Sequence, residues 1–292
     1  MGRAAVLGPN DAVIDLGRRR RIGYATFGDP DGRPVVNCHG GLLSRNDCAP
    51  MDAVARELGL RLISPDRPGI GLTDRLPGHD IVDWARSDLR DLVDTLELER
   101  FRVMGWSAGG QHALAVAHVL GDRVDRVAVV AGCLPIDDLA RRAELSGLDR
   151  RLLRWSEKAP PAARAYFRLT RLLATRAPER LVAMSAAELE GDEHGALAEH
   201  ASWFAHTMAE GSHDPAGLVD DYRAYGAPWG FRPEDVDVPV VIHHGTEDRL
   251  VPVAWAGELA RRLPDATATT YPGVGHLIAV TRAREILTSI AT

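Results

Sequence analysis

A serine between two glycines is the residue in this sequence best suited to start covalent chemistry. The segment Gly105-Trp106-Ser107-Ala108-Gly109 follows an apolar run, Phe101–Gly105, and precedes a helical pattern, Ala108–Leu120. At a sharp turn from strand to helix, a serine is held in a strained backbone conformation that projects its hydroxyl off the end of the sheet. The helix N-terminus supplies a positive dipole and free N–H groups for a developing oxyanion. We therefore predict that Ser107 is a nucleophile, although the same pattern also occurs in structural glycine-rich turns.

A serine hydroxyl is a poor nucleophile near neutral pH, so the sequence must also supply a base. His276 is the best-placed histidine, because it follows the last predicted strand, Ala266–Tyr271, in a glycine-rich loop that can bring it over the sheet edge. The rival histidines His112 and His118 belong to the helix after Ser107. We predict that His276 is the general base.

A third group is needed to fix the tautomer of the imidazole and to stabilise its charged form. Asp248 lies in the loop Thr246–Pro252, which follows the predicted strand Pro239–His243, and we predict that it is the acid. The competing interpretation is that Asp248 is a turn residue or caps the helix that begins near Ala254. The alternative acids are Glu247 beside it, and Asp137 or Asp138 after the run Val124–Ala131.

The loop Asn37–Leu42 can complete this site, because it follows directly after another predicted strand, Pro34–Cys38. Glycine in such a loop lets the backbone approach a ligand closely. A backbone N–H from Gly41, together with that of Ala108, can form a two-donor oxyanion hole. We expect His39 to hold this loop rather than to transfer protons.

Short apolar runs alternate with longer helical patterns, which is typical of a mainly parallel α/β sheet. The turn Asp29-Pro30-Asp31-Gly32 predicts a hairpin between the first two runs, since proline presets φ and glycine supplies a positive φ. Two runs are almost continuously apolar, as expected of strands buried on both faces. The predicted strands are Ile22–Phe27, Pro34–Cys38, Arg61–Ser64, Phe101–Gly105, Val124–Ala131, Pro239–His243 and Ala266–Tyr271, and the predicted helices are Asp52–Leu58, Ile81–Leu96, Ala108–Leu120, Ala254–Leu263 and Arg282–Ile290.

One region lacks this alternation, because from about Leu134 to Phe231 there are helical patterns but no strand candidate. Strand-like sequence resumes directly afterwards, at Pro239–His243, so we interpret the region as a helical cap over one edge of the sheet. A separate helical domain is the alternative. The predicted domains are an α/β core of residues 1–133 and 233–292, and a cap, or lid, of residues 134–232.

Five motifs in chain order resemble those of the α/β-hydrolase family: His39-Gly40-Gly41, Asp66–Asp74 (DRPGIGLTD), Gly105–Gly110 (GWSAGG), His244–Pro252 (HGTEDRLVP) and Gly273–His276 (GVGH). The resemblance extends from about Ile22 to the C-terminus. It implies an α/β-hydrolase fold, with a mostly parallel eight-stranded sheet, helices on both faces and a helical cap inserted after strand 6. It also implies a Ser–Asp–His triad, which the order Ser107, Asp248, His276 matches.

One detail indicates which branch of the family the sequence resembles, and another departs from the family pattern. The turn carries serine rather than aspartate at position 107, so the sequence is similar to the esterase and lactonase branch. Epoxide hydrolases and haloalkane dehalogenases are disfavoured because they need a carboxylate nucleophile. Asn37-Cys38 before His39 departs from the family pattern, in which apolar residues are more usual.

The composition argues against several classes of protein. The net charge of −6, from 35 basic and 41 acidic residues, speaks against nucleic-acid binding. Three cysteines without a C-x-x-C pair fit neither a disulfide scaffold nor a cysteine-rich zinc site, and they favour a reducing compartment. No apolar run approaches the roughly 18 residues of a membrane span, and residues 1–17 lack the unbroken apolar core of a signal peptide. We expect a soluble, cytoplasmic protein that does not bind membranes.

The adjacent histidines His243 and His244 raise the question of a metal site. Neighbouring residues of a strand point to opposite faces, so these two cannot form a pair of ligands on one face. No H-E-x-x-H motif occurs in the sequence. We predict no metal and no organic cofactor.

These features together predict a carboxylesterase-like serine hydrolase, monomeric or homodimeric. It would cleave an ester or lactone of a small, largely apolar molecule through an acyl-enzyme on Ser107. A carbon–carbon bond hydrolase or lyase using the same triad remains an alternative, as does a non-catalytic module that binds a small ligand. The predicted substrate-binding residues are Gly40, Leu42, Trp106, Trp203, Phe204 and Trp229.

Overall fold

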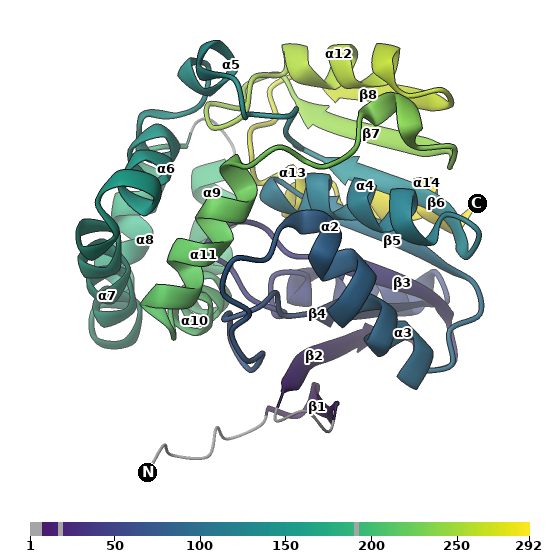
Figure 1. Ribbon diagram of the computed structural model, residues 1–292, viewed down its shortest axis with the longest axis horizontal. Coiled ribbons are helices and arrows are strands. Elements are labelled where there is room, and N and C mark those ends of the chain that lie inside the picture. Colours follow the sequence, from purple (N-terminus) through teal and green to yellow (C-terminus); the bar gives the residue numbers. More distant parts are fainter. Residues whose placement is uncertain (1–7, 17–19, 190–192) are drawn as a thin grey trace.

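The computed structural model describes residues 8–16, 20–189 and 193–292, so residues 1–7 and 17 of the N-terminal segment discussed above lie outside the described part. Its centre is an eight-stranded sheet in the order β1-β2-β4-β3-β5-β6-β7-β8 (Figure 1). β2 is antiparallel to both of its neighbours, whereas β3 to β8 all run parallel. The strands are β1 (Asp11–Asp15), β2 (Arg21–Gly28), β3 (Arg33–Cys38), β4 (Leu60–Pro65), β5 (Phe101–Trp106), β6 (Val124–Val130), β7 (Val240–Gly245) and β8 (Ala266–Tyr271).

The inner strands are buried on both faces, which explains their continuously apolar sequences. In β3 and β6, neighbouring valines such as Val35 and Val36, or Val129 and Val130, are all fully buried although they point to opposite faces. The seven strands predicted from the sequence are confirmed. β1 was not predicted, because it is short, has an aspartate at each end and stays partly exposed along its length.

The hairpin predicted at Asp29–Gly32 is wrong. The turn itself forms, since the N–H of Gly32 donates to the carbonyl of Asp29 at 3.0 Å. However, β4 lies between β2 and β3, with Thr26 opposite Ile63, and β3 pairs in parallel with β4 and β5. Turn residues specify where the chain reverses but not which strand becomes the neighbour, and the apolar β4 takes the buried position. The first hairpin joins β1 to β2 instead.

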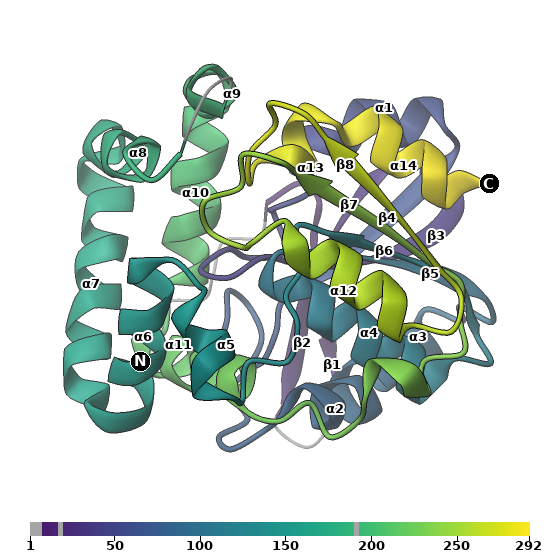
Figure 2. The same cartoon turned by 90° about the horizontal axis from the view of Figure 1, so that it is seen from above.

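Helices cover both faces of the sheet, as Figure 2 shows. α1 and α14 lie on one face, while α2, α3, α4 and α12 lie on the other. The predicted helix Ile81–Leu96 is continuous but contains a π-helical turn, Ala85–Leu89, between α2 and α3. The helices are α1 (Asp52–Glu57), α2 (Ile81–Trp84), α3 (Arg90–Thr95), α4 (Ala108–Leu120), α12 (Ala254–Arg262), α13 (Ile278–Thr281) and α14 (Ala283–Ala291).

The chain between β6 and β7 is helical, and the structure shows no strand among its described residues. Prolines at Pro160, Pro178 and Pro215 each begin a helix, where a missing N–H costs nothing and the fixed φ suits the first turn. We call residues 139–226 the helical insertion; it lies to one side of the sheet (Figures 1 and 2). Its helices are α5 (Leu139–Ala143), α6 (Gly147–Lys158), α7 (Pro160–Arg176), α8 (Pro178–Ala186), α9 (Glu193–Glu199), α10 (Ala201–Gly211) and α11 (Pro215–Gly226).

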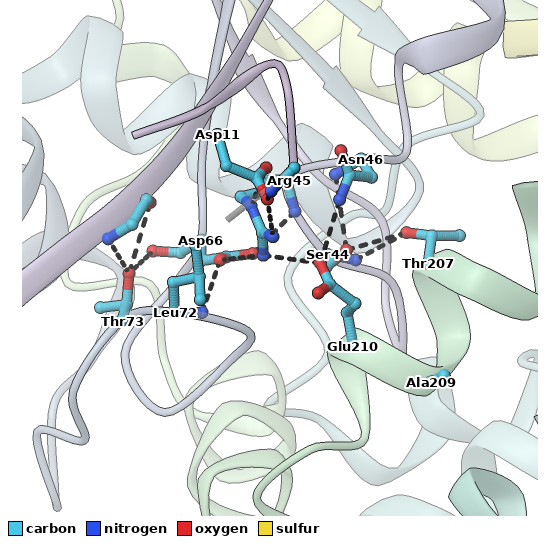
Figure 3. Close-up of polar contacts among 12 residues, drawn as sticks. Asp11, Ser44, Arg45, Asn46, Asp66, Leu72, Thr73, Thr207, Ala209 and Glu210 are labelled. Carbon is cyan, nitrogen blue, oxygen red and sulfur yellow. Dashed lines mark hydrogen bonds and ion pairs between the residues drawn. The ribbon is translucent and has the colours of Figure 1, made fainter. Parts of the chain in front are cut away.

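A buried charge cluster joins this insertion to the core (Figure 3). The Arg45 cluster consists of Arg45, Asp11, Asp66 and Glu210. The Arg45 side chain is only 1% exposed; it lies 2.7 Å from Asp11, 3.0 Å from Asp66 and 2.7 Å from Glu210. Glu210 belongs to α10, whereas Asp11 begins β1 and Asp66 follows β4. One guanidinium therefore bridges carboxylates from three separate parts of the chain.

Replacing Arg45 with methionine should destabilise the protein strongly. The substitution keeps most of the volume but leaves three carboxylates facing one another without a counter-ion. Loss of one partner of a buried ion pair costs about 3–5 kcal/mol, and we expect a loss of that size in the free energy of unfolding, measured by urea denaturation. Arg56→Met is the control, because Arg56 is 57% exposed and pairs with Asp52 on one helix. Equal stability of the two variants would show that the Arg45 cluster does not hold the insertion.

Among the described residues, no helix combines the length and the apolar character needed to cross a membrane.

Candidate active site

The turn between β5 and α4 holds Ser107 in an unusual backbone conformation, with φ 55° and ψ −124°. Its N–H donates to the carbonyl of Val130 at 2.8 Å, which ties the turn to β6. The flanking glycines have no room for side chains. A Cβ at Gly105 would lie 2.2 Å from the carbonyl oxygen of Gly109, and a Cβ at Gly109 would lie 1.9 Å from that of Cys38. Backbone packing therefore requires glycine at both positions of the motif. A strained backbone conformation such as that of Ser107 is characteristic of functional sites.

The Asp248 carboxylate is buried and accepts four hydrogen bonds. One oxygen accepts from the N–H groups of Leu250 and Val251, at 2.8 and 2.9 Å. The other lies 2.9 Å from Nδ1 of His276 and 3.1 Å from Nε2 of His244. Burial alone would raise the pKa of Asp248, but the charge of His276 and the hydrogen bonds from both imidazoles hold this pKa below its usual range. Both the shift and the four hydrogen bonds favour the ionised carboxylate near neutral pH.

The helix-capping interpretation of Asp248 is not supported, since the N-cap of α12 is Val253, which makes no side-chain cap bond. The alternative acids lie elsewhere. Asp138 caps α5 by accepting from the N–H of Ala140 at 3.1 Å, and Glu247 accepts from Thr246 at 3.3 Å. Of the candidate acids, Asp248 is the residue whose carboxylate contacts His276.

His276 donates from Nδ1 to Asp248, because a carboxylate can only accept. The neutral ring therefore has its lone pair on Nε2, the atom that can take a proton from a nucleophile. Burial lowers the pKa of His276, but the charge and hydrogen bond of Asp248, with smaller contributions from Glu193 and Asp149, outweigh it and raise the pKa above the ordinary value of 6.5. The indole N–H of Trp106 donates to the His276 carbonyl at 3.0 Å and fixes the backbone there.

His244 is a contact of Asp248 that sequence reasoning did not identify. Its Nε2 lies within hydrogen-bond distance of both Asp248 and the Val251 carbonyl; since both are acceptors, Nε2 carries the proton. His243 points away and contacts Tyr271 and Ser289, each at 2.8 Å. The predicted opposite orientation of the two histidines is confirmed. Within the described ranges, no group of three or more His, Cys, Asp or Glu side chains is arranged to hold a metal ion.

The loop after β3 brings Gly41 close to Ala108, the two residues predicted to supply the oxyanion hole. The N–H of Gly40 is already occupied, since it donates to Asp47 at 2.9 Å. Gly41 is the next residue, and a Cβ placed on it would lie 3.6 Å from the Cβ of Ala108. Asn37 donates to the same Asp47 carboxylate at 2.6 Å. Asn37, which stands where the family usually has an apolar residue, thus helps to hold the Asp47 carboxylate that binds the loop.

Comparison with known proteins shows which family the sequence belongs to. The family model for the alpha/beta hydrolase fold matches residues 33–283. The chain belongs to the α/β-hydrolase family. A non-heme chloroperoxidase from Streptomyces lividans is 28% identical over 260 residues, which cover 87% of this chain and 89% of the relative.

Solved structures also share the fold of this chain, and two of them illustrate the similarity. A bromoperoxidase from Bacillus anthracis superposes with a TM-score of 0.73 and 21% identity, over 96% of this chain and 99% of that one. The esterase EaEST from Exiguobacterium antarcticum gives a TM-score of 0.71 and 19% identity, over 93% of this chain and 96% of that one.

His39 is fully buried and has the arrangement expected of a residue that holds its loop. Its Nε2 accepts from the N–H of Arg67 at 3.2 Å, and its Nδ1 donates to the Gly40 carbonyl at 2.9 Å. Burial and the Arg67 charge hold the pKa of His39 well below its ordinary value, so the ring is neutral. The Arg67 guanidinium in turn binds Asp221 of α11 at 2.6 Å, which links this loop to the helical insertion.

A cavity of about 370 Å³ opens in front of Ser107 and His276. Its walls come from the loop after β3 and from the helical insertion. Of the predicted substrate-binding residues, Gly40, Leu42, Trp106 and Phe204 line this cavity.

Trp203 and Trp229 do not line the cavity, contrary to the prediction. The indole N–H of Trp203 donates to the Asn46 carbonyl at 2.7 Å, and that of Trp229 donates to Gln111 at 2.8 Å. An indole N–H that leaves water needs a partner, and both side chains find one away from Ser107. Trp203 belongs to α10, whose helical spacing does not show which side faces a cavity, and Trp229 lies beyond the end of α11.

Two polar residues of the cavity, Asp149 and Tyr222, were missed as well. Asp149 lies at the start of α6, where its carboxylate accepts from the Ser146 hydroxyl at 3.0 Å. Burial raises its pKa. In the sequence both residues look like ordinary members of amphipathic helices, so no signal distinguished them.

Proposed function

We propose that this protein is a serine hydrolase that cleaves the ester or lactone bond of a small, largely apolar molecule, and that residues 134–232, which include the helical insertion, act as its cap. The observation that carries the proposal is the arrangement of three residues. Ser107 and His276 line one cavity, and Asp248 lies 2.9 Å from the ring nitrogen of His276. A strained serine with an oriented base is the arrangement that nucleophilic acyl transfer requires.

The reaction would proceed in two steps. Ser107 Oγ attacks the carbonyl carbon while Nε2 of His276 takes its proton, and the charged imidazole is stabilised by Asp248. The N–H groups of Gly41 and Ala108 would bind the oxygen that becomes negative. The C–O bond then breaks and His276 returns the proton to the departing alcohol. Water attacks the acyl-enzyme with the same base, which releases the acid and restores Ser107.

The cavity suggests the class of substrate. Its walls are mostly apolar, with Leu42, Leu173, Phe204 and Met208 among the lining side chains. Apolar cavities with a few polar groups suit small neutral molecules. The structural similarity to the esterase EaEST supports testing esters first.

Rates on p-nitrophenyl esters with acyl chains from two to sixteen carbons should show a preference for the short chains. A cavity of about 370 Å³ limits the acyl group, so we expect kcat/KM to fall by about tenfold or more towards the longest chain. Simple lactones form the second half of the panel. A maximum at sixteen carbons with activation at an oil–water interface would indicate a lipase. Because several of the similar proteins are haloperoxidases, bromide with hydrogen peroxide is also assayed. Halogenation without ester turnover would overturn the proposal.

A further inference from the structure

A buried glutamate from the helical insertion touches the loop that carries His276. Glu193 is the first residue of α9 and is only 1% exposed. Its Oε1 accepts from the N–H of Leu277 at 2.5 Å. On the other side of His276, a Cβ at Gly275 would lie 1.9 Å from Oε2 of Glu193. The carboxylate therefore lies against the backbone on both sides of His276, and glycine at position 275 leaves the space for it.

This contact completes the support of the His276 backbone. Trp106, beside Ser107, holds the His276 carbonyl through its indole N–H. Glu193 holds the next N–H along the chain, just before α13 begins at Ile278. A buried carboxylate is costly unless its oxygens are hydrogen-bonded, so a glutamate at this position needs a reason beyond filling space.

The charge of Glu193 also acts on the ring. The ionisable groups that influence His276 come from separate elements: Asp248 from the loop after β7, Glu193 from α9 and Asp149 from α6. His244, on β7, contacts the same Asp248 oxygen as His276 and is the other ring in this group. Each of the three carboxylates raises the pKa of His276. Among these carboxylates, Glu193 also contacts the backbone of the His276 loop, because it accepts a hydrogen bond from the N–H of Leu277 at 2.5 Å.

We infer that Glu193 is a positioning residue of this site, which holds the His276–Leu277 backbone in place and stabilises the charged imidazole formed during turnover. The inference rests on the proposed function, because it assigns His276 the role of base. His276 can then act as a base only when the helical insertion, which carries Glu193, is packed against the His276 loop. The insertion then does more than enclose the substrate.

Two substitutions separate the two effects of Glu193. Glu193→Gln keeps an oxygen that can accept from Leu277 but removes the charge. Glu193→Ala removes both. Glu210→Gln is the matched control, since Glu210 is also a carboxylate of the insertion that binds the core, through Arg45 and Asn46.

The readouts are the pH dependence of Ser107 labelling by a fluorophosphonate and the NMR titration of the His276 ring, assigned by its absence in His276→Asn. In the wild type, the labelling rate should fall with decreasing pH as His276 becomes protonated, at a midpoint above 6.5. Removing a nearby negative charge favours the neutral ring, so in Glu193→Gln both midpoints should move about half a pH unit or more to lower pH. The rate at high pH should stay within about threefold, because the acceptor oxygen remains.

Glu193→Ala should show the same shift and also lose about tenfold or more in the rate at high pH, because the loop is no longer held. Glu210→Gln should leave both midpoints unchanged. Titration curves of Glu193→Gln that coincide with those of the wild type, or an equal shift in Glu210→Gln, would overturn the inference even if Glu193→Ala fails to fold. A wild-type protein whose Ser107 is not labelled at any pH would instead overturn the proposed function, and the role of Glu193 with it.

Discussion

Ser107→Ala should stop turnover while the protein stays folded. The substitution removes the hydroxyl that we propose attacks the substrate, and the Cβ already present at φ 55° is kept. Loss of a triad nucleophile lowers turnover by a factor on the order of 10⁴ or more. Deleting one hydroxyl at a strained turn should change the free energy of unfolding by no more than about 1 kcal/mol. Steady-state rates on the best ester of the panel, with thermal melting of both proteins, measure the two effects.

Ser156→Ala is the matched control for this prediction. Ser156 is also a buried serine, on α6, and its hydroxyl has no hydrogen-bond partner among the described residues. It does not line the cavity, so activity and fluorophosphonate labelling should both be retained in this variant. The labelled peptide should be the one that contains Ser107, seen as a mass increment that disappears in Ser107→Ala. A Ser107→Ala protein that keeps more than about a tenth of the wild-type rate would show that another residue is the nucleophile.

The parts of the structure that the sequence predicts well are those determined by local backbone contacts and by the burial pattern of each strand. The turn around Ser107 is one, because Gly105 and Gly109 are required by backbone contacts within the turn and with β3. The inner strands are another, since burial on both faces demands continuous apolar runs. These two features, with the chain order of the motifs, are enough to expect the α/β-hydrolase fold.

Contacts set by tertiary packing could not be predicted in the same way. Which neighbour β2 takes depends on the burial of β4, not on the turn at Asp29–Gly32. Trp229 and Phe204 are both aromatic residues after β6, yet only Phe204 faces the cavity, because the indole of Trp229 finds its partner in Gln111. Glu193 reaches the His276 loop from a helix far away in sequence, and nothing near it in the chain signals that contact.

Asp248→Asn should reduce turnover almost as much as the serine substitution. Asp248 accepts from four donors, two backbone N–H groups and the rings of His276 and His244. An asparagine has a single acceptor oxygen, and its NH₂ group can only donate. If the oxygen keeps the backbone N–H groups of Leu250 and Val251, the NH₂ group faces Nδ1 of His276 and requires the lone pair there. The ring then carries its proton on Nε2, so it cannot accept the proton of Ser107, and turnover should fall by a factor on the order of 10⁴.

The controls for this substitution are the acids that the sequence offered as alternatives. Glu247→Gln changes the neighbouring residue, which is exposed, and Asp138→Asn changes the cap of α5. Both should retain most of the activity, because neither side chain contacts His276 in the structure. In Asp248→Asn, His276 loses a carboxylate that raises its pKa, so the residual activity should also show its acid limb at lower pH than the wild type. If Asp248→Asn is almost harmless while Asp137→Asn or Asp138→Asn is crippling, the acid that serves His276 follows β6, and the loop after β7 serves only to hold the fold.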